Sequence, residues 1–168
     1  GPVDPLVEVF LAQWKLEHGE PAAAYAHLLR VEREWPEAKF VRLDLADAAL
    51  QLGDVGGAQQ WLAPLSFRDC AGIVSKRILL RLHSEVAEAK GDLGLAEALH
   101  EILAARYAAT TQSNLGHARR LARLGRSWEA VDVIHRLREW NPRPPTWERD
   151  AREVLIAAAR TLTWADLA

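Results

Sequence analysis

The stretch Gly19-Glu20-Pro21-Ala22-Ala23-Ala24 decides the fold because its pattern recurs along the chain. A glycine with an alanine five positions later occurs four times, as Gly19 and Ala24, Gly53 and Ala58, Gly91 and Ala96, and Gly125 and Ala130. The first and last intervals between these glycines are equal, and the middle interval is four positions longer. A regular period of this length is typical of stacked repeat units rather than of one closed core.

Each unit has the pattern of two antiparallel helices. A small residue stands seven positions before each glycine, at Ala12, Ala46, Ser84 and Ala118. Small residues on facing sides let two helices approach closely, and apolar residues at intervals of three and four supply each buried stripe. The glycine ends the first helix in a left-handed conformation. In the first and last units a proline, Pro36 or Pro142, ends the second helix.

This pattern resembles the tetratricopeptide repeat, a helix-turn-helix unit with small residues at the helix crossing, a glycine at the turn and a proline at the end. The resemblance covers residues 5–142 and is weakest in the third unit, where His83 and His100 replace large apolar residues. It implies an all-α fold, a right-handed α-solenoid of about four helical hairpins with a C-terminal capping helix. The alternative is an irregular helical bundle with accidental periodicity.

The expected organisation follows from this alignment. A tag remnant at residues 1–4 precedes repeats at approximately 5–38, 39–72, 73–110 and 111–144, and a capping helix and tail fill 145–168. Helices are predicted at about 5–18, 22–35, 38–52, 55–64, 73–90, 93–108, 111–124, 127–140 and 147–161. Pro21 suits a first helical turn, and Asp54, Asp92 and Thr146 are predicted N-caps. Residues 64–72 are predicted to form a loop.

Composition narrows the functional classes. No apolar run approaches membrane-spanning length, so direct membrane insertion of this segment is not expected. The single cysteine, Cys70, excludes an internal disulfide framework and is compatible with a cytoplasmic or a periplasmic location. The lack of Met and the start Gly1-Pro2 indicate an excised segment of a larger protein. The Ala, Leu and Arg content is compatible with a bacterial source.

Charge is distributed unevenly along the chain. Residues 1–65 carry ten acidic and five basic side chains, whereas residues 111–168 carry seven acidic and ten basic ones, all arginine. A dipolar surface can orient a partner or a second copy, although solvated helix faces that differ by chance would give the same counts. The net charge of −2 and the scarcity of lysine argue against nucleic-acid binding.

The sequence contains no recognisable catalytic motif. A phosphate-binding glycine loop, a nucleophile elbow, a zinc-protease helix and paired metal-ligand cysteines are all absent from it. His83, His100 and His117 are evenly spaced, half a repeat apart, and three imidazoles can bind zinc. The alternatives are hydrogen-bonded core histidines or a pH-sensitive joint between repeats. We therefore predict a protein without enzymatic activity, metal or other cofactor.

The resemblance implies that the first helix of each unit lines a concave, partner-binding groove. Carried over by alignment, the candidate partner-binding residues are Val9, Gln13, Phe40, Leu43, Asp47, Arg81, Glu85, Leu115, Arg119 and Arg123. Arg119 and Arg123 lie four positions apart and could together hold a carboxylate, so the expected ligand is a segment with apolar side chains and a carboxylate near one end. A solvated arginine pair and apolar residues packed in the core are the alternatives.

These features predict a non-catalytic scaffold that binds a protein or peptide. The resemblance suggests tasks such as assembling a secretion or polysaccharide-export complex within a larger protein. Self-association and a spacer role beside an attached enzymatic domain are the competing hypotheses. Most of the seven tryptophans are expected to pack between helices, whereas Trp164 is a candidate partner contact.

Overall fold

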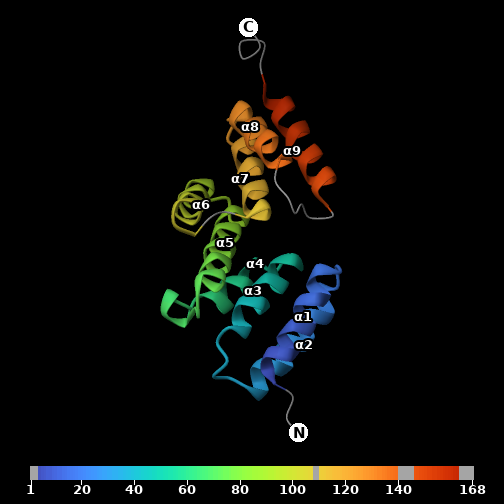
Figure 1. The fold of residues 1–168 in the computed structure, drawn as a ribbon, viewed down its shortest axis with the longest axis vertical. Coiled ribbons are helices and arrows are strands. Elements are labelled where there is room, and N and C mark those ends of the chain that lie inside the picture. Colours follow the sequence, from blue (N-terminus) through green and yellow to red (C-terminus); the bar gives the residue numbers. More distant parts are fainter. Residues whose placement is uncertain (1–3, 108–109, 140–145, 163–168) are drawn as a thin grey trace. The chain divides into compact units, whose positions relative to one another are not determined.

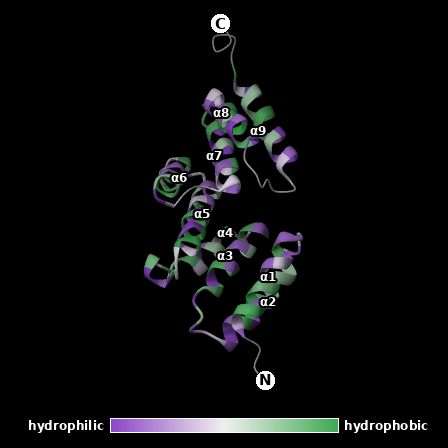
Figure 2. Cartoon of the chain, in the orientation of Figure 1, coloured by the Kyte–Doolittle hydropathy of each residue, from purple (hydrophilic) through white to green (hydrophobic). Residues whose placement is uncertain are grey.

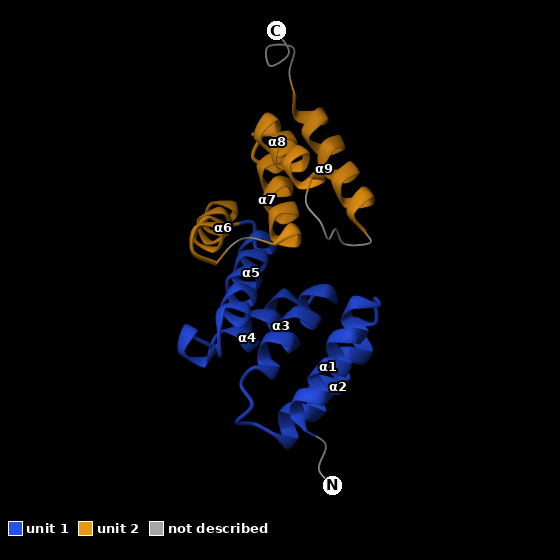
Figure 3. Cartoon of the chain, viewed as in Figure 1, with its two compact units in different colours: residues 1–91 blue, residues 92–168 orange. Residues whose placement is uncertain are grey.

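The computed structural model describes residues 4–107, 110–139 and 146–162 (Figure 1). Within these ranges it contains nine α-helices and one short 3-10 helix, with no strand. The predicted all-α, helical-repeat class is therefore confirmed. The chain divides into two compact units, residues 1–91 and 92–168, which are described separately (Figure 3). The boundary follows Gly91, the turn glycine of the third predicted hairpin.

Unit 1 is built from consecutive helices that pack in chain order. It contains α1 (Pro5–Glu17), α2 (Pro21–Glu34), α3 (Val41–Gln51), α4 (Val55–Leu62), the 3-10 helix η1 (Phe67–Asp69) and α5 (Ile73–Ala89). Helix α3 lies between two apolar clusters. Its residues Val41, Leu45 and Ala48 pack with α1 and α2. On its other side, Leu43 and Ala46 pack with α4 and α5.

In the structure, the repeated glycines form the turns and the repeated alanines lie at the helix crossings, as predicted from the sequence. Gly19 and Gly53 end the first helices with φ of 78° and 79°, a conformation that costs glycine little. The small residues at the predicted crossings of the first hairpin, Ala12 and Ala24, are both fully buried. Close helix packing in each hairpin thus depends on the absence of larger side chains at these positions.

Unit 2 contains α6 (Leu93–Tyr107), α7 (Thr111–Arg123), α8 (Ser127–Arg138) and α9 (Trp147–Thr161). Helices α7, α8 and α9 share one apolar cluster that includes Leu121, Ile134 and Val154. Helix α9 buries Trp147 and Ala158 in this cluster and exposes charged residues on its outer side, so it covers the last hairpin as predicted. In both units each helix carries hydrophobic and hydrophilic residues, as the colouring by hydropathy shows (Figure 2).

The predicted helix bounds agree with the observed ones to within a few residues, and two of the three predicted caps are confirmed. Asp54 accepts a hydrogen bond from the Gly57 backbone at 2.8 Å, and Asp92 accepts one from Leu95 at 3.0 Å. Thr146 occupies the N-cap position of α9 as predicted, but its hydroxyl donates to Asp150 at 2.7 Å and makes no capping hydrogen bond to the backbone. The aspartate competes for the hydroxyl at this helix start.

The predicted loop at 64–72 contains the 3-10 helix η1, which the sequence pattern did not indicate. Ser66 and Asp69 close this turn, since the Ser66 backbone donates to the Asp69 carboxylate at 2.9 Å. No helix within the described residues is long and apolar enough to cross a membrane. Two sequence predictions, the closing Pro142 and the partner contact at Trp164, lie outside the described residues.

Candidate protein-interaction face

The first helices of unit 1 are joined by polar side chains on one shared face. Gln13 of α1 donates to Asp44 of α3 at 3.0 Å. Arg81 of α5 reaches back to α3 and donates to Asp47 at 2.9 Å. These hydrogen bonds link three successive first helices. We call Gln13, Asp44, Asp47, Arg81 and Glu85 the first-helix network.

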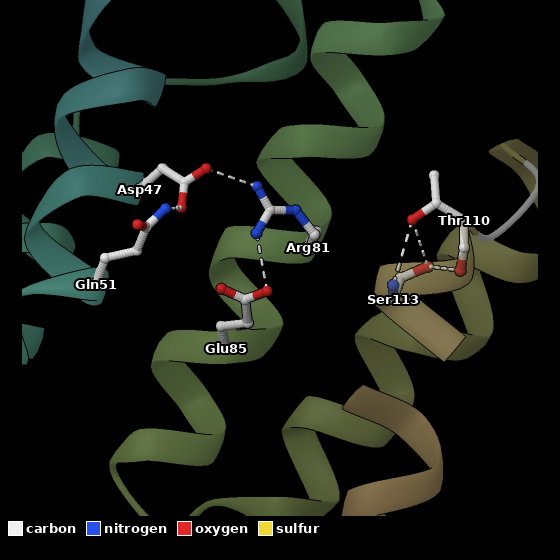
Figure 4. Close-up of polar contacts among 6 residues, drawn as sticks. All are labelled: Asp47, Gln51, Arg81, Glu85, Thr110 and Ser113. Atoms are coloured by element: carbon white, nitrogen blue, oxygen red, sulfur yellow. Dashed lines mark hydrogen bonds and ion pairs between the residues drawn. The ribbon is translucent and has the colours of Figure 1, made fainter. Parts of the chain in front are cut away.

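Arg81 is the centre of this network. Its guanidinium lies between two carboxylates, donating to Asp47 from one nitrogen and to Glu85 at 2.8 Å from the other (Figure 4). Gln51 completes the arrangement by donating to the second oxygen of Asp47 at 3.3 Å. The side chain of Arg81 is 13% exposed, and those of Asp47 and Glu85 are 22% and 34% exposed. Solvent therefore reaches the carboxylates more readily than the guanidinium.

Burial and charge act in opposite directions on Arg81. Burial favours its neutral form, but the charges of Glu85 and Asp47 and their hydrogen bonds outweigh burial and raise the pKa of Arg81 further above its ordinary value. Arg81 therefore stays charged and holds the two carboxylates near each other. With Asp44 ionised, the network contains three carboxylates and one guanidinium, so it carries an excess of negative charge.

Asp44 is the least favourably placed carboxylate of the network. Burial raises its pKa from 3.8 to about 6, and the neighbouring charge of Asp47 adds to this rise. The hydrogen bond from Gln13 and the charge of Arg81 act in the opposite direction but only offset part of the effect. Asp44 was not among the sequence-predicted site residues, although the repeat alignment pairs it with Phe10 on the first helix of the preceding unit.

The ten predicted partner-binding residues divide into three groups. Gln13, Asp47, Arg81 and Glu85 come together in the first-helix network, and Phe40 is partly buried directly before α3. Val9, Leu43 and Leu115 are at most 5% exposed and belong to the apolar clusters, so they stabilise the fold rather than present side chains to a partner. Arg119 and Arg123 are exposed on α7 in unit 2.

Two of the three spaced histidines meet in unit 2. His100 of α6 and His117 of α7 stack with ring centroids 4.3 Å apart. Burial, and after it the electrostatic interactions with His117 and Arg120, lower the pKa of His100 to about 4, so its ring is neutral near pH 7. His83 belongs to unit 1. Among the described residues, no group of three or more His, Cys, Asp or Glu side chains is arranged to hold a metal ion.

A buried ion pair ties α6 to α7 next to these rings. Arg120 of α7 is 2% exposed and donates from Nε to Glu97 of α6 at 2.7 Å. The second carboxylate oxygen of Glu97 lies 2.7 Å from Nδ1 of His117. Burial opposes ionisation of Glu97, but Arg120 and His117 outweigh it and lower the pKa of Glu97 below its ordinary value. This network is structural, because its charges are satisfied inside the unit.

Comparison with known families identifies the repeat of unit 1. Residues 15–69, from the end of α1 to η1, match the family model of the tetratricopeptide repeat. The match supports a tetratricopeptide-like repeat in this segment. Tetratricopeptide repeats generally mediate protein–protein interaction and typically act as non-catalytic scaffolds. Searches among curated proteins and among solved structures found no match.

Proposed function

We propose that this chain is a non-catalytic interaction module that binds a protein or peptide segment on the first-helix face of unit 1. The observation that carries the proposal is the first-helix network, in which three successive first helices contribute to one set of connected polar side chains. Partly exposed polar groups on adjacent helices of a repeat offer a partner several contacts on one surface.

The composition of this face favours a particular ligand. The network contains three carboxylates and one guanidinium, so the face attracts lysine or arginine side chains. Leu6 of α1 is 53% exposed and Phe40 is partly exposed, so apolar ligand side chains also find partners on these helices. The ligand that fits is a segment with basic and apolar residues. A ligand carboxylate held by Arg119 and Arg123 of unit 2 stays a separate prediction.

The finer parts of this function belong to the same proposal. They are the absence of an enzymatic role, the absence of nucleic-acid binding, and a task in a secretion or polysaccharide-export type of complex. The competing candidate, a spacer that supports an attached enzymatic domain, needs no ligand on the first-helix face. Direct peptide binding to that face therefore separates the two.

The test is a peptide selection followed by affinity measurement. Peptides selected by display on the wild-type protein are expected to be enriched in Lys or Arg next to apolar residues. Their dissociation constants are then measured by fluorescence anisotropy for wild type and for Glu85→Gln, in which the carboxylate paired with Arg81 becomes neutral. We expect about fivefold to tenfold weaker binding, because one charge-assisted contact contributes roughly 1 kcal/mol.

Glu129→Gln is the matched control. Glu129 also pairs with an arginine of its own hairpin, Arg126, but it lies in unit 2 and its side chain is 56% exposed. Equal affinity of both variants for the selected peptides, with circular dichroism showing intact helix content, would remove the first-helix face as the binding site. Failure to select any peptide would favour the spacer role.

A further inference from the structure

Helix α1 has a second apolar side that stays about half exposed among the described residues of unit 1, with the His18 ring stacked on Trp14 at a centroid distance of 4.0 Å. Val9, Ala12 and Leu16 form its buried side. The opposite side carries four residues that are between 49% and 67% exposed, and we call them the outer face of α1: Val7, Phe10, Leu11 and Trp14. Helical spacing of three and four residues gathers them into one stripe. An exposed apolar stripe of this size marks an interaction surface.

The second repeat shows what such a stripe normally contacts. A shift of one repeat along the chain places Val7, Leu11 and Trp14 on Val41, Leu45 and Ala48. These three residues of α3 are fully buried and belong to the cluster that includes Leu28 of α2. The equivalent stripe of α3 is thus covered by a helix. By the same logic, the outer face of α1 suits a helix packed against it.

The other terminal helix has a different surface. The outer side of α9 in unit 2 exposes charged residues, among them Glu148, Arg149, Arg152, Glu153 and Arg160. A polar outer side suits a helix that ends a stack of repeats in water. The outer face of α1 lacks this polar character, so it fits a partner helix that also presents apolar side chains, which the charged side of α9 does not.

We propose that two copies of this chain pair through the outer faces of their α1 helices, in antiparallel orientation about a twofold axis near Phe10 and Leu11. In this arrangement Val7 of each copy lies opposite Trp14 of the other, a small side chain against a large one. Asp4, which precedes the helix, comes within reach of Lys15 of the other copy. Antiparallel helix dipoles add a favourable term.

The size of the contact sets its strength. Four large side chains, each about half exposed, offer roughly 400 Å² per copy, or about 800 Å² in the dimer. This area is at the low end for specific contacts, so the dimer should be weak and concentration-dependent. The inference does not depend on peptide binding, because it uses another side of α1 from Gln13 and can hold if the first-helix face binds nothing.

Sedimentation equilibrium from about 5 μM to 1 mM tests the pairing. Wild type should show a monomer–dimer equilibrium, and Leu11→Glu should raise the dissociation constant at least about tenfold, because it places two like charges next to the twofold axis. The matched control is Ile73→Glu on α5, which changes another exposed apolar residue, 65% exposed, into the same acid. The control should dimerise as wild type does.

A charge reversal tests the orientation. Lys15→Glu should weaken the dimer, and the double variant Asp4→Lys/Lys15→Glu should restore part of the lost affinity if the helices are antiparallel. Circular dichroism checks that each variant is folded. A wild type that stays monomeric up to 1 mM, or equal weakening by Leu11→Glu and Ile73→Glu, would overturn the proposal. The first of these results would leave the outer face to a helix other than α1 of a second copy.

Discussion

Replacing Asp44 by asparagine is expected to stabilise unit 1 at neutral and alkaline pH. In the folded protein the pKa of Asp44 is raised from 3.8 to about 6, chiefly by burial. A group whose pKa is raised on folding stabilises the folded state when the pH is below its pKa in the unfolded chain. This contribution to the free energy of unfolding is lost as the pH rises through the pKa of the folded state. The relevant window therefore runs from about pH 4 to 6.

The magnitude follows from the difference between the two pKa values. Each pKa unit corresponds to 1.36 kcal/mol, so ionised Asp44 costs the fold about 3 kcal/mol above pH 7 relative to its protonated form. Asparagine has nearly the same shape, carries no charge and keeps an oxygen that can accept the hydrogen bond from Gln13. Asp44→Asn should therefore raise the free energy of unfolding by about 2–3 kcal/mol at pH 8 and change it little at pH 4.

Urea denaturation at several pH values, followed by circular dichroism, measures this difference. Asp132→Asn on the exposed side of α8 is the control and should change the unfolding free energy by less than about 0.5 kcal/mol at every pH. A carbon-detected NMR titration of the Asp44 carboxyl group should give a midpoint near 6. A gain in stability that is the same at pH 4 and pH 8, or no gain at all, would refute the electrostatic argument.

Three further predictions concern the packing and the turns. Leu45→Ala should lower the unfolding free energy by about 2–5 kcal/mol in urea denaturation, since this side chain is fully buried between α1, α2 and α3. Gly53→Ala should lower the free energy of unfolding by roughly 1–2 kcal/mol, measured as a lower Tm. A Cβ at this position would meet open space, so the cost comes from the left-handed backbone conformation, with φ of 79°. The free energy of unfolding of unit 2 should fall by roughly 1–2 kcal/mol as pH falls from 7.5 to 5. The reason is that folding lowers the pKa of His100 from 6.5 to about 4, so the stability present above pH 6.5 is lost as the pH falls toward 4. Denaturation of His100→Gln should show a smaller loss over the same range.

The helical hairpins could be predicted from the sequence because their signals are local. A glycine that must adopt positive φ and an alanine five positions later define the turn and the crossing within one unit, so Gly19 and Ala24 needed no long-range information. The burial of Val9, Leu43 and Leu115 was harder to predict. An apolar residue on a first helix suits either a groove or a core, and only the packing of neighbouring helices decides between them.

Alignment of the repeats alone does not predict which side chains pair in the first-helix network. The alignment on glycines pairs Asp47 with Glu85, which would set two like charges side by side on adjacent first helices. The structure instead joins Asp47 to Arg81, four positions before Glu85. The four extra positions between the second and third glycines correspond to about one helical turn, so Arg81 lies on the same face as Glu85 and one turn before it. The longer interval therefore leaves the same face of α5 toward α3 but places Arg81, rather than Glu85, next to Asp47. Arg81 lies between two carboxylates that would otherwise repel each other.

This arrangement also explains why Asp44 and the network belong to one functional argument. Arg81 neutralises part of the charge of Asp47 and Glu85, but Asp44 is left with a neutral donor, Gln13, as its hydrogen-bond partner. A cationic ligand side chain on this face would lower the pKa of Asp44 toward its ordinary value and recover part of the roughly 3 kcal/mol that its ionisation costs. Binding of a basic segment should then weaken as pH falls below about 6, whereas binding to Asp44→Asn should be weaker at pH 8 and nearly independent of pH in this range. If wild type and Asp44→Asn showed the same affinity and the same pH dependence, the Asp44 carboxylate would have no part in recognition.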